Sequence, residues 1–212
     1  MDSPFQLMSL CAGLGAGDLG IRLAIPSART VCSVEIESYC IEILVSAMEN
    51  GLLDAAPVWT DLRTFDGRPW RGRIHLILAG YPCTPFSSAG KRLGSKDPRH
   101  LWPEVKRVIG EVEPPLVLLE NVADHLGLGF LDCVKPELEG MGYVVEAGLF
   151  SAAEVGASQA RCRLFALAYR AGARHHDAGE HVQPPLLLRT RSEQCGGELA
   201  DPRDGLLQEP GP

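Results

Sequence analysis

The sequence predicts an α/β fold built on a doubly wound, mostly parallel β-sheet. Short apolar stretches alternate along the chain with segments whose apolar residues recur at helical spacing. Each strand–helix–strand unit favours a right-handed crossover, which places successive strands parallel in one sheet. The last two apolar stretches, 143–150 and 162–169, follow each other without a helix between them. An antiparallel edge is therefore expected there.

The expected elements follow this alternation from the N-terminus onward. A strand at 6–11 leads through a glycine-rich loop into a short helix at 18–24. Residues 39–50 are expected to form the second helix because their apolar residues lie on one helical face. The other strands are expected at 30–35, 58–60, 74–79, 116–119, 143–150 and 162–169, and the other helices at 101–112 and 130–141.

Length and composition limit the classes of protein to which this chain can belong. The 212 residues are enough for one domain with a substantial core, which we expect at 1–170. From residue 171 onward glycine, proline and charge dominate, so residues 171–212 are expected to form a poorly ordered tail. The start lacks a basic segment followed by an apolar one, and no run approaches the ~18 apolar residues of a membrane span. These features favour a cytoplasmic protein without a membrane partner.

The cysteines and histidines indicate no metal centre. Seven cysteines without a C-x-x-C pair argue against a structural zinc site and a disulfide framework, so reduced thiols are expected. His175, His176 and His181 lie in the predicted tail, which lacks a fourth ligand. No metal is therefore expected.

The segment after the apolar run at 74–79 places a cysteine between two prolines. Residues 80–88 read GYPCTPFSS, and Cys83 falls just beyond a predicted buried strand, where ligands bind in open α/β sheets. Pro82 fixes its own φ angle, and the second proline restricts the residue before it. A thiol held this rigidly suits nucleophilic attack on a substrate carbon. The motif alone leaves open an inert buried cysteine in a proline-rich turn.

A glycine-rich loop joins the first strand to the first helix. Residues 9–20 read SLCAGLGAGDLG, which lets backbone N–H groups approach a ligand at the helix N-terminus. The G-x-G-x-x-G pattern beginning at Gly15, with Glu35 about 20 residues on as a ribose ligand, matches the fingerprint of a nicotinamide enzyme. Asp18 disfavours a pyrophosphate and tolerates the ammonium group of an amino-acid-bearing nucleoside, which points to S-adenosylmethionine. A turn without a ligand is the third reading.

Four motifs occur together in the order and spacing of one family. They are the glycine loop, Pro82-Cys83, the Glu-Asn-Val of 120–122 and the QARCR of 159–163. Over about residues 6–170 the chain resembles a catalytic domain of the cytosine-5 DNA methyltransferases. The resemblance implies a Rossmann-like sheet of the S-adenosylmethionine-dependent methyltransferase type and DNA (cytosine-5-)-methyltransferase activity. S-adenosyl-L-methionine is then the cofactor, and duplex DNA with a flipped cytosine the partner.

The resemblance also implies the roles of four residues. Cys83 matches the nucleophile, whose thiolate adds to C6 of cytosine and makes C5 reactive toward a methyl group. Glu120 matches the acid that offsets charge on the ring through N3. Arg161 and Arg163 match arginines offered to the base or its backbone, and they are candidate cations for favouring the thiolate.

On the cofactor side, the family pattern maps onto the segments that follow the first three predicted strands. Glu35 matches the ribose contact, Ile36 an adenine face and Asp61 the contact to the adenine amino group. Cys11 stands where family members usually carry a phenylalanine, and losing that apolar contact weakens cofactor binding by about 1–2 kcal/mol. The expected cofactor residues are Cys11, Ala12, Gly13, Gly15, Glu35, Ile36, Asp61, Leu62 and Pro82.

After Tyr169 the family pattern continues with a target-recognition region and two further motifs, which this sequence does not show. The formal net charge of -7 fits this, because DNA phosphates are normally bound by a basic face. Four readings stay open beside the active enzyme. They are a truncated or partial gene product, a half whose second subunit supplies target recognition, a degenerate non-catalytic domain, and an RNA cytosine-5 methyltransferase.

Overall fold

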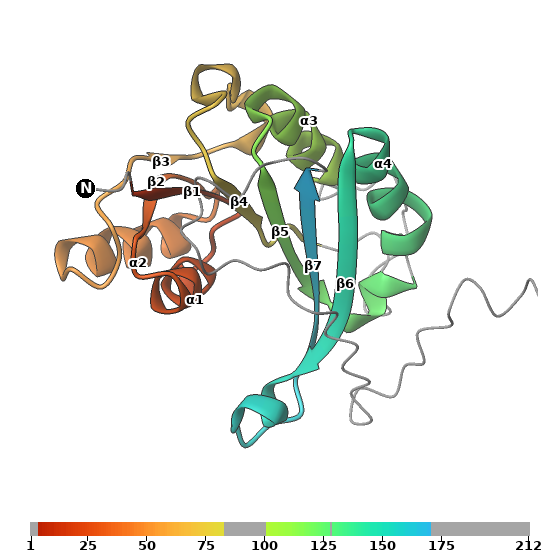
Figure 1. Ribbon diagram of the computed structural model, residues 1–212. Coiled ribbons are helices and arrows are strands. Elements are labelled where there is room, and N and C mark those ends of the chain that lie inside the picture. The colour runs from red at the N-terminus through yellow and green to blue at the C-terminus, as the bar shows by residue number, and fades with distance from the viewer. Residues whose placement is uncertain (1–3, 83–100, 128, 171–212) are drawn as a thin grey trace, which may run out of the picture.

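The computed structural model describes residues 4–82, 101–127 and 129–170, which form a seven-stranded sheet in the order β3-β2-β1-β4-β5-β7-β6 (Figure 1). The strands are β1 (Phe5–Leu10), β2 (Ala28–Val34), β3 (Val58–Trp59), β4 (Leu76–Ala79), β5 (Leu116–Val122), β6 (Tyr143–Ser151) and β7 (Cys162–Arg170). The α-helices are α1 (Ala16–Ala24), α2 (Ser38–Glu49), α3 (Trp102–Val112) and α4 (Lys135–Gly140). Shorter helical turns are η1 (Leu62–Thr64), η2 (Arg68–Trp70), η4 (Ala123–Leu126), η5 (Phe130–Val134) and η6 (Ala152–Val155).

The sheet is doubly wound, as the alternation of elements predicts. The strands β3, β2, β1, β4 and β5 pair in parallel, whereas β7 runs antiparallel to both β5 and β6. β1 lies between β2 and β4, so the chain winds outward from the centre in one direction and then in the other. The predicted antiparallel edge is confirmed.

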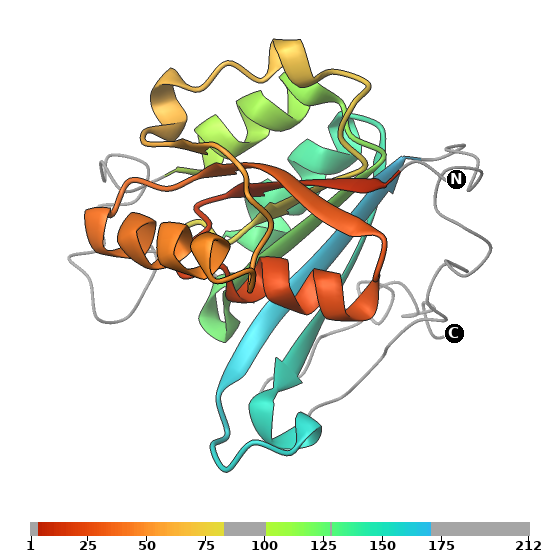
Figure 2. The same ribbon diagram turned by 90° about the vertical axis from the view of Figure 1, so that its left-hand side faces the viewer.

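Helices cover both faces of the sheet, with α1 and α2 on one face and α3 and α4 on the other (Figure 2). On the α1 side, Leu7 and Leu78 form a core cluster against which Ile21 packs. On the α3 side, Met8 and Val108 belong to a larger cluster. Because side chains alternate along a strand, Leu7 and Met8 of β1 contact opposite layers. None of the helices in the described ranges is long and apolar enough to cross a bilayer.

Several parts of the fold differ from the expected elements. β5 continues to Val122 rather than ending at Leu119, because its last residues pair with β7 and Val122 lies opposite Arg163. The helix expected at 130–141 divides into the π-helical turn η5 and α4, which has Pro136 in its first turn. The connection from β3 to β4 contains the 3₁₀ turns η1 and η2, which are too short to leave a periodic pattern.

Asp18 of α1 is buried and links three elements. Its Oδ2 accepts a hydrogen bond from Ser9 Oγ of β1 at 2.8 Å, and its Oδ1 accepts one from Thr30 Oγ1 of β2 at 2.9 Å. Burial raises the pKa of Asp18 above its ordinary value of 3.8, and the two hydroxyl groups oppose that shift. Asp18 therefore does not distinguish a pyrophosphate from the ammonium group of S-adenosylmethionine, because its side chain is directed at the strands.

Candidate active site

The predicted site residues that the structure describes gather at one edge of the sheet, where the parallel strands end. Backbone hydrogen bonds join the segments that leave neighbouring strands: Gly80 N donates to Leu10 O at 3.2 Å, and Ala12 N donates to Val34 O at 3.1 Å. β7 runs in the opposite direction, so its first residues reach the same edge beside the end of β5. Open α/β sheets bind ligands in the crevice outside these strand ends.

The segment that leads to Cys83 is anchored to the end of β5. Tyr81 is buried, and its carbonyl oxygen accepts a hydrogen bond from Asn121 Nδ2 at 2.9 Å. The Tyr81 hydroxyl lies 2.9 Å from His125 Nε2 in η4. Pro82 is exposed at the edge, and Cys83 lies outside the described residues. The assignment of Cys83 as nucleophile therefore stays a prediction.

Glu120 and Arg163 meet at this edge, with Arg163 Nε 2.9 Å from Glu120 Oε1. The register explains the contact, because Arg163 lies opposite Val122 and Glu120 is two residues earlier on the same face of β5. A Cβ placed on Gly80 would lie 3.6 Å from both Glu120 Oε2 and Cys11 O. The carboxylate therefore extends across the end of β4 toward the glycine loop.

Arg161 and Cys162 lie in the segment that enters β7. Arg161 is exposed, and in the described part of the chain it is Arg163 that pairs with Glu120. Cys162 is disulfide-bonded. The free cysteines among the described residues are Cys11, Cys32, Cys40 and Cys133. The prediction of reduced thiols is therefore wrong for Cys162, because the spacing of cysteines in the sequence does not fix which thiols come within bonding distance in the fold.

Glu35 follows β2, and its buried carboxylate holds the glycine loop. Its Oε2 accepts a hydrogen bond from Gly13 N at 2.7 Å, and its Oε1 accepts bonds from Ile36 N and Glu37 N, both at 2.9 Å. The side chain is 7% exposed. A carboxylate offers about four acceptor positions, so these bonds leave capacity for a ligand donor such as a hydroxyl group.

Cys11 begins the glycine loop in the left-handed backbone region, with φ at 53°. The strand expected at 6–11 ends at Leu10 for this reason, because a strand requires extended dihedrals. Burial, followed by the negative charge of Glu35, raises the pKa of the Cys11 thiol to about 12. The thiol therefore stays protonated at neutral pH and contributes a small apolar surface rather than a nucleophile.

Asp61 follows β3 and caps the turn η1. Its Oδ1 accepts a hydrogen bond from Arg63 N at 2.9 Å. The backbone N–H of Glu35 donates to the last residue of β3 at 2.9 Å, so the two carboxylate-bearing segments leave adjacent strands. Leu62 is buried in the core, whereas Ile36 is 54% exposed at the same edge.

The glycines of the first loop distinguish two cofactor types. Gly15 has φ at 79°, and a Cβ there would lie 2.5 Å from Leu53 Cδ1. A Cβ on Gly17 would lie 2.6 Å from Leu78 Cδ2, whereas no described atom lies within 4 Å of one on Gly20. In the dinucleotide fingerprint the third glycine is the one that permits close helix–strand packing. Gly20 lacks that packing, so the loop does not fit a nicotinamide fingerprint.

Three residues shape the site through contacts that the sequence did not indicate. Asn121 reaches Tyr81 across 40 positions, and Arg107 of α3 reaches Leu62 across 45 positions. His125 follows β5 without a motif of its own. Asn121 belongs to the Glu-Asn-Val motif of 120–122, but the motif did not reveal that its amide would bind the Tyr81 carbonyl group.

Comparisons with known proteins show which family this chain is similar to. The family model described as C-5 cytosine-specific DNA methylase matches residues 5–194. The Type II methyltransferase M.NgoMIV of Neisseria gonorrhoeae is 34% identical over 170 residues, 78% of this chain and 52% of that protein. M.PspPI of Psychrobacter sp. is 30% identical over 203 residues, 93% of this chain and 47% of that protein. The chain thus spans about half the length of these relatives.

Solved structures share the fold. The Dnmt2 methyltransferase of S. pombe matches with a TM-score of 0.63 and 24% identity, over 78% of this chain and 51% of that one. DNMT2 of Spodoptera frugiperda matches with a TM-score of 0.65 and 18% identity, over 79% of this chain and 50% of that one. The expected methyltransferase-type sheet is confirmed. With a family match over most of its length and a relative at 34% identity, the chain belongs to the C-5 cytosine-specific DNA methylase family.

Proposed function

We propose that this chain is the cofactor-binding and catalytic part of a DNA (cytosine-5-)-methyltransferase, which transfers the methyl group of S-adenosyl-L-methionine to C5 of cytosine. The observation that carries the proposal is the pairing of Glu120 with Arg163 beside the segment that leads to Cys83. A carboxylate, a guanidinium group and a thiol are suited to binding the polar edge of a pyrimidine and adding to its ring.

Cys83 is the proposed nucleophile. Its sulfur forms a bond to C6 of cytosine, and the electron pair of the C5–C6 double bond becomes available at C5. S-adenosyl-L-methionine, when bound, supplies an electrophilic methyl group. A base then takes the C5 proton, and the electron pair of the C5–H bond re-forms the double bond as the C6–S bond breaks and the Cys83 thiolate leaves. The anchoring of Tyr81 supports this role, because nucleophilic attack is fastest when the nucleophile is held in a fixed orientation toward the reacting carbon.

Glu120 is the proposed contact to N3 of the base. Negative charge develops on the ring as the sulfur–carbon bond forms, and a proton shared between Glu120 and N3 offsets it. Arg163 holds Glu120 Oε1 through Nε, which leaves Oε2, on the side of Gly80, for the base. In this proposal Arg163 also binds O2 of the base, and the exposed Arg161 contacts the DNA backbone.

The ends of β2 and β3 fit S-adenosyl-L-methionine. Ribose hydroxyls and the adenine amino group are donors, and Glu35 and Asp61 offer acceptor oxygens at adjacent strand ends. The exposed Ile36 offers an apolar face for the adenine ring. The proposed pocket is completed by Cys11, Ala12, Gly13, Gly15, Leu62 and Pro82.

Duplex DNA is the proposed substrate, with target recognition supplied outside this chain. The chain spans about half the length of its relatives, which supports a further region or a second subunit for that task. The formal net charge of -7 agrees, because sequence-independent affinity for DNA comes from basic residues on its phosphates. The proposed location of this activity is the cytoplasm.

Transfer of a labelled methyl group tests the proposal. The purified chain is incubated with S-adenosyl-L-methionine and either duplex DNA or transfer RNA, beside the Cys83→Ala variant. Incorporation into DNA that requires Cys83 is expected. Incorporation into RNA alone would assign the chain to RNA instead. No incorporation, even after a target-recognition region is added in trans, would contradict catalysis and favour a degenerate domain.

A further inference from the structure

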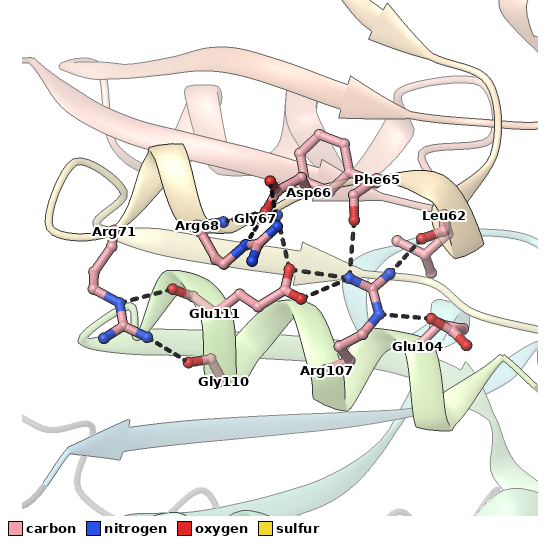
Figure 3. Close-up of polar contacts among 10 residues, drawn as sticks. All are labelled: Leu62, Phe65, Asp66, Gly67, Arg68, Arg71, Glu104, Arg107, Gly110 and Glu111. Carbon is pink, nitrogen blue, oxygen red and sulfur yellow. Dashed lines mark hydrogen bonds and ion pairs between the residues drawn. The ribbon is translucent and has the colours of Figure 1, made fainter.

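We propose that Arg107 of α3 is a positioning residue for the adenine end of the cofactor site, acting through the turn that carries Asp61. The inference rests on the proposed function, in which Asp61 accepts a hydrogen bond from the adenine amino group. It is carried by the contacts between α3 and residues 62–71, shown in Figure 3.

Asp61 lies in the connection between β3 and β4, outside the paired strands of the sheet. β3 has two residues, and the next element is the three-residue turn η1. Asp61 Oδ1 accepts a hydrogen bond from Arg63 N within that turn, so the direction of the carboxylate follows the position of η1. A short 3₁₀ turn is weakly stable alone, so its neighbours must fix it.

Arg107 holds both ends of η1. Its Nη2 donates to Leu62 O at 2.7 Å, and its Nη1 donates to Phe65 O at 2.9 Å. A planar guanidinium that bonds two carbonyl groups fixes their separation as well as their position. The Leu62 and Phe65 side chains are buried, so the turn cannot rotate away without exposing them.

Two glutamates of α3 direct the guanidinium. Glu104 Oε2 accepts from Arg107 Nε at 2.8 Å, and Glu111 Oε1 accepts from Nη1 at 2.9 Å. Glu111 Oε2 also accepts from Gly67 N at 2.8 Å, which ties the connection to α3 a second time. A lysine at position 107 can keep a charge contact with these carboxylates but lacks the fork that spans two carbonyl groups.

Arg71 provides a matched control, because it holds the other end of the same connection to the same helix. Its Nε donates to Glu111 O at 2.9 Å, and its Nη2 donates to Gly110 O at 3.2 Å. The Arg71 contacts hold the end of the connection that is farther from Asp61 in the sequence. Arg71→Lys therefore reports on a general loosening of the connection, and Arg107→Lys reports on the turn beside Asp61.

The experiment measures the binding of two ligands by calorimetry. One is S-adenosylhomocysteine, and the other is its purine analogue, which lacks the adenine amino group. The wild-type chain is expected to prefer S-adenosylhomocysteine about tenfold, the effect of one polar contact. Arg107→Lys should reduce that preference to about twofold or less, whereas Arg71→Lys should retain it. Thermal unfolding establishes that each variant is folded at the assay temperature.

A second variant covers the case in which Arg107→Lys does not fold. Glu111→Gln keeps an acceptor for Gly67 N but removes the charge that holds the Arg107 guanidinium. It should therefore reduce the preference for S-adenosylhomocysteine, by a smaller factor than Arg107→Lys. A reduced preference in either folded variant, Arg107→Lys or Glu111→Gln, supports the inference. An unchanged preference in a folded Arg107 or Glu111 variant overturns it, as does an equal loss in Arg71→Lys.

The same measurement separates this inference from the function on which it rests. A wild-type chain that binds both ligands equally would refute the Asp61 contact and the role of Arg107 with it, while leaving cofactor binding intact. A wild-type chain that binds neither ligand would refute the proposed function itself.

Discussion

Arg163 Nε lies 2.9 Å from Glu120 Oε1, although the two residues approach the site from opposite directions. β5 delivers Glu120 as it ends, and the antiparallel β7 delivers Arg163 as it begins. A β7 parallel to β5 would begin at the other end of the sheet. The antiparallel edge therefore brings together the pair that we propose binds the base, while the parallel strands carry the predicted cofactor residues.

Glu120→Gln should slow methyl transfer by about 100-fold or more, the effect of losing one acid–base group. The amide cannot share a proton with N3 in the same way and cannot form the ion pair with Arg163. The affinity for S-adenosylhomocysteine, measured by calorimetry, should stay unchanged. Glu146→Gln on the exposed face of β6 is the matched control and should behave as wild type. A loss confined to cofactor affinity would contradict the assignment of Glu120 to the base.

Asn121→Ala should lower the free energy of unfolding by about 1–3 kcal/mol, because the buried Tyr81 carbonyl loses its donor. Methyl transfer should fall as well, since the segment before Cys83 loses an anchor. Denaturant unfolding measures the first effect and an initial-rate assay the second. Asn50→Ala at the exposed end of α2 serves as control, with an effect within about 0.5 kcal/mol. Full activity in Asn121→Ala would show that this anchor does not govern the nucleophile.

Asp18→Asn should flatten the dependence of stability on pH. Burial raises the pKa of Asp18, so the folded chain retains a proton at pH values where the unfolded chain has lost it. This contribution to stability is fully present below the ordinary value of 3.8 and is lost as pH rises through the higher folded pKa. The stability of wild type relative to the variant should therefore decrease as pH rises from about 4 toward neutrality. Urea unfolding at several pH values measures this difference, and curves that stay parallel would contradict it.

Cys83→Ser should abolish methyl transfer while leaving the affinity for S-adenosylhomocysteine intact. A hydroxyl group is a far weaker nucleophile than a thiolate at neutral pH, and the proposed cofactor contacts lie on other strands. The assay compares initial rates with calorimetric affinity in the same preparation. Wild-type rates in the serine variant would remove Cys83 from the mechanism.

Much of the architecture could be predicted from the sequence, because the alternation of apolar strands and amphipathic helices fixes a parallel sheet and aligns its strand ends. Glu35 and Asp61 could be assigned to one edge for this reason. The two closing strands, without a helix between them, indicated an antiparallel edge, but the insertion of β7 between β5 and β6 was not predicted. The register that sets Arg163 opposite Val122 was not available from any local pattern.

The contacts that could not be predicted from the sequence are polar and join residues that are far apart in the chain. The direction of the Asp18 side chain depends on Ser9 and Thr30, which lie on two different strands. The bond between Arg107 and Leu62 depends on how α3 packs against an irregular connection. Helical periodicity marks the apolar face of α3, but it does not reveal which backbone carbonyl a guanidinium at its margin will reach.

Covalent trapping tests the central claim most directly. Wild-type chain and Cys83→Ala are incubated with S-adenosyl-L-methionine and duplex DNA that contains 5-fluorocytosine, whose fluorine blocks the final elimination. We expect a protein–DNA adduct on a denaturing gel for the wild type, alone or with a recognition region added in trans, and none for Cys83→Ala. An adduct that forms equally in both proteins, or none under either condition, would contradict covalent catalysis by Cys83.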